Sequence, residues 1–123
     1  MNPANADAKG SLPDFNECLI EFSALPWDDI KPFVREKRVN RSGQVIRFVE
    51  FRQGFEEDGW CESGHVGYVT QGRLEVRFED RSISVSEGDA IWIPAGSAYR
   101  HRATVVGEFV RLILFESDTP ESP

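Results

Sequence analysis

The stretch Gly88-Asp-Ala-Ile-Trp-Ile-Pro94-Ala-Gly96 decides the fold class of this sequence. Gly88 can take the positive φ that a tight turn needs, and the aspartate after it is a second turn residue. The apolar run from Ala90 to Ile93 predicts a short strand, and Pro94 with Gly96 predicts another turn. A short strand enclosed by turns on both sides is typical of an all-β protein.

Apolar and polar residues alternate on the N-terminal side of this stretch, which predicts further strands. The strand that begins at Gln44 carries Val45, Arg47, Val49 and Phe51 on one side and Ile46, Phe48, Glu50 and Arg52 on the other. The same alternation returns in Leu74 to Phe78 and in Ser82 to Ser86, and Asp80 with Arg81 predicts a hairpin between these two runs. One face of each strand is expected to be buried and the other exposed.

The other expected elements are also short. They are a strand over Leu19–Leu25, a turn or single helical turn over Pro26–Phe33, and strands over Tyr99–Thr104 and Glu108–Phe115. At least seven short strands with almost no helix predict an all-β sandwich or barrel. Periodicity alone does not choose between these two architectures.

The length and composition indicate one folded domain. The chain has 123 residues, of which 40% are hydrophobic and 28% are charged, as in an ordinary globular domain. Residues 1–13 and 118–123 are rich in polar residues and proline, so we expect disordered tails on either side of a domain that covers residues 14–117.

The charge of the chain restricts its partners. A formal net charge of −7 disfavours nucleic acid and anionic lipid, both of which bind clustered Lys and Arg. We find no signal peptide and no apolar run of membrane-spanning length, so we expect a cytoplasmic protein without a membrane or nucleic-acid partner. The two cysteines, Cys18 and Cys61, are expected to be reduced thiols.

Two segments together resemble the cupin family. The spacing of Gly88, Pro94 and Gly96 matches the second cupin motif, and Gly59 to Gly72 is similar to the first. The resemblance spans residues 35–116. It implies the double-stranded β-helix, a jelly-roll barrel of RmlC-like type, with a ligand pocket inside the mouth of the barrel.

The resemblance also shows where a metal site is expected. Metal-binding cupins take two histidines and a glutamate from the first motif and a histidine from the second. Here the glutamate position falls on His65, the first-motif histidine positions fall near Gly59 and Cys61, and the second-motif histidine position falls on Tyr99. None of the four residue types matches, so the ligand set of the family does not transfer as it stands.

Strand parity nevertheless predicts a pocket with new residues. It places Cys61 with His65 on one face and Tyr99 with His101 on another, provided that both segments are extended. We therefore predict a ligand pocket formed by His65, Tyr99, His101, Cys61 and Trp92, in which Cys61, His65 and His101 can bind a divalent metal such as Zn, Fe, Mn or Ni. A metal-free pocket is the preferred alternative, because substituted ligand sets more often mark a lost metal.

Two readings of Gly67, on the same face as His65, stay open. The missing side chain leaves space for a small molecule above the imidazole, or it allows two strands to approach closely.

The function expected from these features is binding of a small polar molecule in the barrel pocket. The alternative is a small cupin enzyme, a metal-dependent oxygenase, isomerase or lyase, that uses the Cys/His site; its catalytic residues are not assigned. A homodimer is also expected, through a free sheet edge at the N-terminal strand or at Glu108–Phe115.

Overall fold

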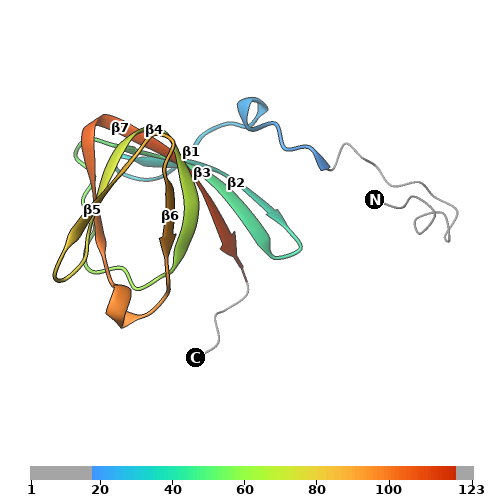
Figure 1. Ribbon diagram of the computed structural model, residues 1–123. Coiled ribbons are helices and arrows are strands. Elements are labelled where there is room, and N and C mark those ends of the chain that lie inside the picture. The colour runs from blue at the N-terminus through green and yellow to red at the C-terminus, as the bar shows by residue number, and fades with distance from the viewer. Residues whose placement is uncertain (1–17, 119–123) are drawn as a thin grey trace, which may run out of the picture.

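The computed structural model describes residues 18–118, which form an antiparallel all-β fold (Figure 1). Its strands are β1 (Asp28–Lys31), β2 (Val34–Arg41), β3 (Gln44–Arg52), β4 (His65–Arg77), β5 (Ser82–Ser86), β6 (Ala90–Ile93) and β7 (Arg102–Ser117). Their order in the sheet is β1-β2-β3-β7-β4-β5, and β6 pairs with the first residues of β4. The predicted all-β fold of at least seven strands is confirmed.

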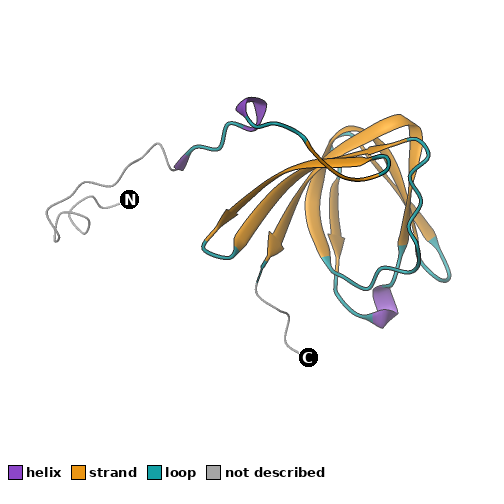
Figure 2. Cartoon of the chain, turned by 180° about the vertical axis from the view of Figure 1, so that it is seen from behind, coloured by secondary structure: helices purple, strands orange, loops and turns teal. Residues whose placement is uncertain are grey.

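The strands curl around an apolar interior, and the helical segments between them are short 3-10 turns (Figure 2). Cross-strand pairing explains where the core lies. Val49 of β3 pairs with Leu112 of β7, which pairs in turn with Val69 of β4, and the three side chains are fully buried. Paired residues point to the same face of a sheet, so this face is the inner one.

The stretch from Gly88 to Gly96 folds as predicted. Gly88 has a φ of 91° and donates its N–H to the carbonyl of Val69 at 3.0 Å. The Asp89 carboxylate accepts a hydrogen bond of 2.9 Å from the backbone N–H of Ser86, which closes the turn. Gly96, with a φ of 122°, begins the turn after β6. Both glycines thus occupy backbone conformations that other residues rarely adopt.

The predictions for the N-terminal segments are wrong. The segment Leu19–Leu25 contains the 3-10 turn η2 (Phe22–Ala24) in place of a strand, and Pro26–Phe33 contains the strand β1 in place of a turn. The strand β1 was missed because its exposed residues are held in a strand by pairing with β2, and the local sequence does not show this pairing.

The prediction of two C-terminal strands is also wrong, because Arg102–Ser117 is one continuous strand, β7. Between the pairs Gln71↔Arg111 and Arg73↔Val106, β7 carries more residues than β4, and Gly107 has a φ of 87°. The strand therefore continues through a bulge where the sequence pattern indicated a break. β7 lies between β3 and β4, so Glu108–Phe115 offers no free sheet edge.

The N-terminal segment covers part of the outer face of the sheet. The rings of Phe22 and Trp27 lie 6.0 and 5.3 Å from the ring of Phe48 in β3. The guanidinium groups of Arg35 and Arg111 lie over the Trp27 indole at 4.3 and 5.7 Å. The indole therefore joins the segment to β2, β3 and β7.

We expect Trp27→Ala to lower the free energy of unfolding by about 2 kcal/mol, because it removes an aromatic pair and cation–π contacts. Urea denaturation of both proteins measures this difference. Trp27→Phe should recover part of the loss, and a Trp27→Ala protein as stable as the wild type would contradict the packing role.

Beneath this segment lies Glu50, whose side chain is fully buried. Its carboxylate oxygens accept hydrogen bonds from Arg35 at 2.8 and 3.0 Å and from Arg111 at 2.8 Å, and Arg52 lies 2.8 Å away. Burial alone would raise the pKa of Glu50, but the hydrogen bonds and charges of Arg35 and Arg111 outweigh it and lower the pKa to about 2. Glu50 is therefore ionised at neutral pH.

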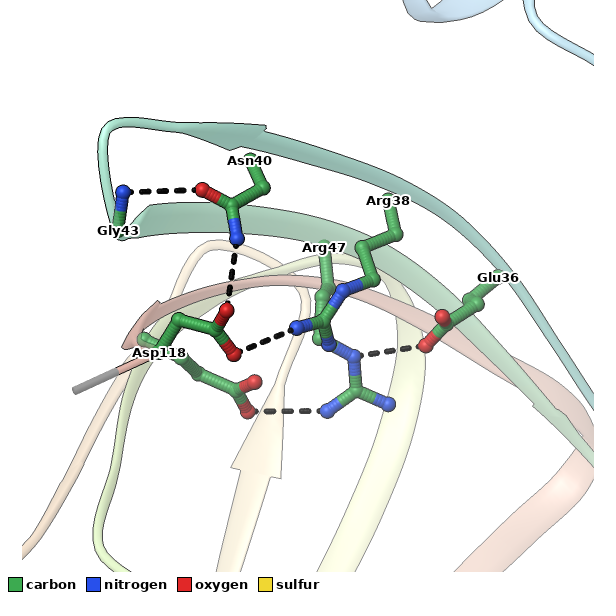
Figure 3. Close-up of polar contacts among 7 residues, drawn as sticks. Glu36, Arg38, Asn40, Gly43, Arg47 and Asp118 are labelled. Atoms are coloured by element: carbon green, nitrogen blue, oxygen red, sulfur yellow. Dashed lines mark hydrogen bonds and ion pairs between the residues drawn. The ribbon is translucent and has the colours of Figure 1, made fainter. Parts of the chain in front are cut away.

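Asp118, the first residue of the expected C-terminal tail, contacts the β2–β3 hairpin (Figure 3). Its carboxylate accepts a hydrogen bond from Asn40 at 3.0 Å and pairs with Arg38 at 3.3 Å, and its N–H donates to the carbonyl of Gly43. The expected tails at residues 1–13 and 119–123 lie outside the described residues. Within residues 18–118, no helix has the length and apolar character needed to cross a membrane.

Candidate functional site

Three of the predicted pocket residues meet inside the mouth of the barrel. Cys61 Sγ lies 3.7 Å from Nε2 of His65, and the rings of His65 and His101 are 5.2 Å apart at an angle of 77°. One ligand atom from each of Cys61, His65 and His101 lies within 4.8 Å of the other two. The structure thus brings these three side chains together.

The backbone fixes the positions of these residues. Cys61 and His101 form an isolated bridge, in which each backbone N–H donates to the other's carbonyl, at 2.8 and 2.9 Å. His65 begins β4, where it pairs with Ile93 of β6. A loop, a strand start and the residue just before β7 are thus brought together by ordinary sheet hydrogen bonding.

Each imidazole has a defined environment. His101 is 3% exposed, and its Nδ1 donates to the carbonyl of Tyr99 at 2.9 Å, which leaves Nε2 with a free lone pair in the neutral ring. Burial lowers the pKa of His65, and the neighbouring His101 lowers it further, whereas Glu116 opposes this change. The lowered pKa of His65 favours the neutral form in which histidine binds metals.

A chain of charged side chains leads from the β2–β3 hairpin to His65. Arg47 donates a hydrogen bond of 2.7 Å to Glu36 (Figure 3). It donates a second hydrogen bond, of 2.9 Å, to Glu116. The same Glu116 carboxylate lies 3.9 Å from Nδ1 of His65, a buried atom without a hydrogen-bond partner among the described residues. A carboxylate near the far nitrogen of a histidine is common where the histidine binds a metal, because it orients the ring.

Cys61 and His65 line an open cavity of about 580 Å³, whereas the buried His101 does not contribute to its lining. Its lining combines polar residues such as Arg47, Ser63 and Glu116 with the apolar side chains of Val66, Trp92 and Phe115. A smaller interior cavity of about 60 Å³ lies between His65 and His101 on one side and the apolar core on the other. The larger cavity has the size of an ordinary small-molecule site.

The structure does not bring the Tyr99 side chain into this group. Parity assumed an extended segment, but Tyr99 lies in the 3-10 turn η3 (Ser97–Tyr99), is 47% exposed and lines a separate surface pocket with Phe78 and Trp92. It is the Tyr99 carbonyl, through its contact with His101, that belongs to the site. Trp92, 78% exposed on the outer side of β6, lines the rim of the larger cavity.

Glu57 is a site residue that sequence reasoning missed. It belongs to the acidic run Glu56 to Asp58, and its carboxylate accepts a hydrogen bond from the Ala103 N–H at 3.1 Å and lines the interior cavity with both histidines. Burial raises the pKa of Glu57, and the Ala103 N–H partly offsets this effect. No periodicity exists in a loop, so the sequence carried no signal for this position.

The residues present fit a divalent transition metal. Thiolate and imidazole ligands bound to one zinc ion lie roughly 3.4–3.6 Å apart in tetrahedral geometry. The 3.7 Å between Cys61 and His65 agrees with that spacing, and the 4.8 Å limit for the whole group requires only small side-chain movements. Sulfur and nitrogen ligands of this kind suit zinc and neighbouring first-row metals.

A family model and several solved structures are similar to this chain, and both agree with the observed all-β fold. A family model described as the cupin domain matches residues 61–115, which include all three residues of the Cys/His group. No protein of curated function matches the sequence.

Three solved structures illustrate the similarity. KdgF from Halomonas sp. is 26% identical, with a TM-score of 0.66 over 80% of this chain and 92% of that one. The polyketide cyclase RemF from Streptomyces resistomycificus is 18% identical, with a TM-score of 0.68 over 82% and 79% of the chains. An RmlC-like cupin from Shewanella frigidimarina is 17% identical, with a TM-score of 0.62 over 80% and 88%.

The similarities to RemF and to the Shewanella cupin, at 18% and 17% identity, establish the fold alone. Together with the family model and the all-β architecture, these matches show that the chain is a small cupin-domain protein of RmlC-like fold.

Proposed function

We propose that this cupin binds a small polar molecule at the mouth of its barrel, on a divalent metal ion held by Cys61, His65 and His101. The observation that carries the proposal is the mutual approach of their ligand atoms, all within 4.8 Å. One thiol and two imidazoles form a ligand set that suits zinc and neighbouring first-row metals.

The surroundings of the three residues support this function. His101 is oriented by the Tyr99 carbonyl, and His65 faces the Glu116 carboxylate. Three protein ligands leave at least one coordination position for a small molecule, which the adjoining cavity of about 580 Å³ can hold. A bound metal supplies Lewis acidity at that position. The enzymatic alternative uses the same residues and stays a prediction.

Cobalt titration tests the proposal. We expect the full-length protein, purified without a histidine tag and stripped with a chelator, to bind about one equivalent of Co²⁺ and to show a thiolate-to-cobalt charge-transfer band. Cys61→Ser should lose the band and bind Co²⁺ about 100-fold more weakly, because it removes one of three ligands. Thermal melts confirm that each variant is folded.

Cys18→Ser is the matched control, since Cys18 is the exposed free thiol. It should behave like the wild type. Binding of less than about a tenth of an equivalent, or an unchanged band in Cys61→Ser, would reject the metal site and leave the metal-free pocket.

A further inference from the structure

A second cavity, of about 350 Å³, lies at the hairpin between β1 and β2, at one edge of the sheet. Its walls come from β1, from the turn after it, from the start of β2 and from the last residue of β3, Arg52. We call it the β1–β2 cavity. Among residues 18–118, it shares no lining residue with the cavity beside Cys61 and His65. It is therefore a separate place where a ligand can bind.

The β1–β2 cavity is basic, although the chain is acidic. Of the described residues that line it, Lys31, Arg35 and Arg52 are basic and only Asp29 is acidic. The net charge of −7 repels anions from most of the molecular surface. A surplus of cations in one cavity therefore marks the place where an anion is attracted.

The buried Glu50 does not neutralise this surplus, because three guanidinium groups share its one carboxylate. Arg35 binds Glu50 through Nε and Nη2, at 2.8 and 3.0 Å. The Nε atoms of Arg52 and Arg111 each lie 2.8 Å from the same carboxylate. Within the described part of the chain, Nη1 of Arg35 and both terminal nitrogens of Arg52 have no hydrogen-bond partner, and the Arg52 side chain is 54% exposed. These N–H groups are available to an anion.

Exposed apolar side chains form another wall of the cavity. Phe33 is 51% exposed and Ile30 is 44% exposed. The Phe33 ring is held against Gly54, where an added Cβ would come within 3.0 Å of it. A ring held in place beside free guanidinium groups suits a ligand that has both an apolar part and a negative charge.

The backbone of Phe33 also points to a binding role. Its φ of 68° lies in the left-handed region, which glycine adopts freely and which is an outlier for a bulky residue. A phenylalanine in this two-residue turn therefore costs stability, and its half-exposed ring adds little to the core in return. Side chains in such conformations are found disproportionately at ligand sites.

We propose that the β1–β2 cavity binds a small organic anion, a phosphate ester or a carboxylate that carries an apolar ring. Arg35 and Arg52 hold the anionic group, because guanidinium groups donate paired N–H groups to the oxygens of both phosphate and carboxylate. The apolar ring packs against Phe33 and Ile30. The proposal uses no residue of the Cys/His group, so it succeeds or fails independently of the metal site.

An NMR titration of the full-length protein tests the proposal, with phenyl phosphate, benzoate and inorganic phosphate as probes. We expect phenyl phosphate to shift the backbone amide signals of Val34 and Arg52, whose N–H donates to the Phe33 carbonyl, with a dissociation constant on the order of 1 mM or tighter. Inorganic phosphate should bind at least about 5-fold more weakly, because it has no ring to pack. Tighter binding of phenyl phosphate or of benzoate identifies the anionic group.

The guanidinium contact is tested by Arg52→Gln, which should weaken the binding of phenyl phosphate about 10-fold by removing charge-assisted hydrogen bonds. Arg35 and Arg111 still bind Glu50 in this variant, and a thermal melt checks that it is folded. The matched control is Arg81→Gln, which removes an exposed arginine outside the cavity and should bind the probe like the wild type.

The apolar contact is tested by Phe33→Gly, which should stay folded because the backbone conformation suits glycine. We expect it to bind phenyl phosphate about 5-fold more weakly and inorganic phosphate as the wild type does. Cys61→Ser should bind phenyl phosphate like the wild type. The absence of shifts at millimolar phenyl phosphate, unchanged binding in Arg52→Gln, or shifts confined to the signals around Cys61 and His65 would overturn the proposal.

Discussion

Glu50→Gln should lower the free energy of unfolding by about 3–5 kcal/mol, the usual cost of breaking a buried ion pair. The Glu50 carboxylate is fully buried among Arg35, Arg52 and Arg111. The amide keeps the shape of the side chain but removes its charge, and the three guanidinium groups then lose the carboxylate that they share. Urea denaturation at neutral pH measures the difference.

The matched control is Asp80→Asn, which removes an ion pair with Arg81 in which both side chains are 72% exposed. Exposed pairs contribute little, so the stability of this variant should match that of the wild type. Equal effects of the two substitutions would show that burial does not strengthen the Glu50 cluster.

The same cluster predicts a pH dependence of stability. The pKa of Glu50 is lowered from 4.5 to about 2 in the folded protein, so the unfolded chain binds its proton first as the pH falls. The stabilisation from Glu50 is thus complete above about pH 4.5 and is lost progressively as the pH falls toward 2, amounting to roughly 3 kcal/mol. The stability of Glu50→Gln should fall less steeply over this range.

Gly67→Ala should destabilise the protein by about 3 kcal/mol through a backbone clash. A Cβ added to Gly67 would collide with the carbonyl oxygen of Ile113 and would lie 2.8 Å from Cδ2 of Leu114. No side-chain rotation relieves a contact with backbone, so β4 and β7 would have to separate. Of the two readings of this glycine, the geometry therefore supports close strand approach.

Gly59→Ala is the control for this substitution. An added Cβ at Gly59 meets no atom within 4 Å, so we expect a change within about 0.5 kcal/mol. Urea denaturation compares the two variants with the wild type. A Gly67→Ala protein that matches Gly59→Ala would show that the two strands separate at little cost.

The alternation in β3 predicted that Arg47 shares a side of the strand with Val45 and Val49. The structure places it on the inner face, where it pairs with Glu36 and Glu116 beside His65, a role that was not predicted. Parity placed Cys61 and His65 on one face on the assumption that residues 61–65 form a regular strand. In the structure β4 begins only at His65, and the position of Cys61 is fixed by its backbone bridge to His101.

Other features depend on contacts that no local pattern contains. Glu50 was placed opposite the apolar side of its strand, and it is buried because the arginines of β2, β3 and β7 enclose it beneath the N-terminal segment. Tyr99 was assigned by parity, which fails in a 3-10 turn because successive side chains no longer alternate. The barrel could be predicted from the two cupin motifs, because the spacing of turn residues is visible in the local sequence.

The mutual hydrogen bonds between Cys61 and His101 have a kinetic consequence. They join a loop to a residue that follows the whole β4–β6 segment, so this contact closes a long stretch of chain and carries a large loop-closure entropy. Such contacts form after local hairpins such as β4–β5. The Cys/His group should therefore assemble after these hairpins, and cobalt absorbance in a refolding experiment would follow that step.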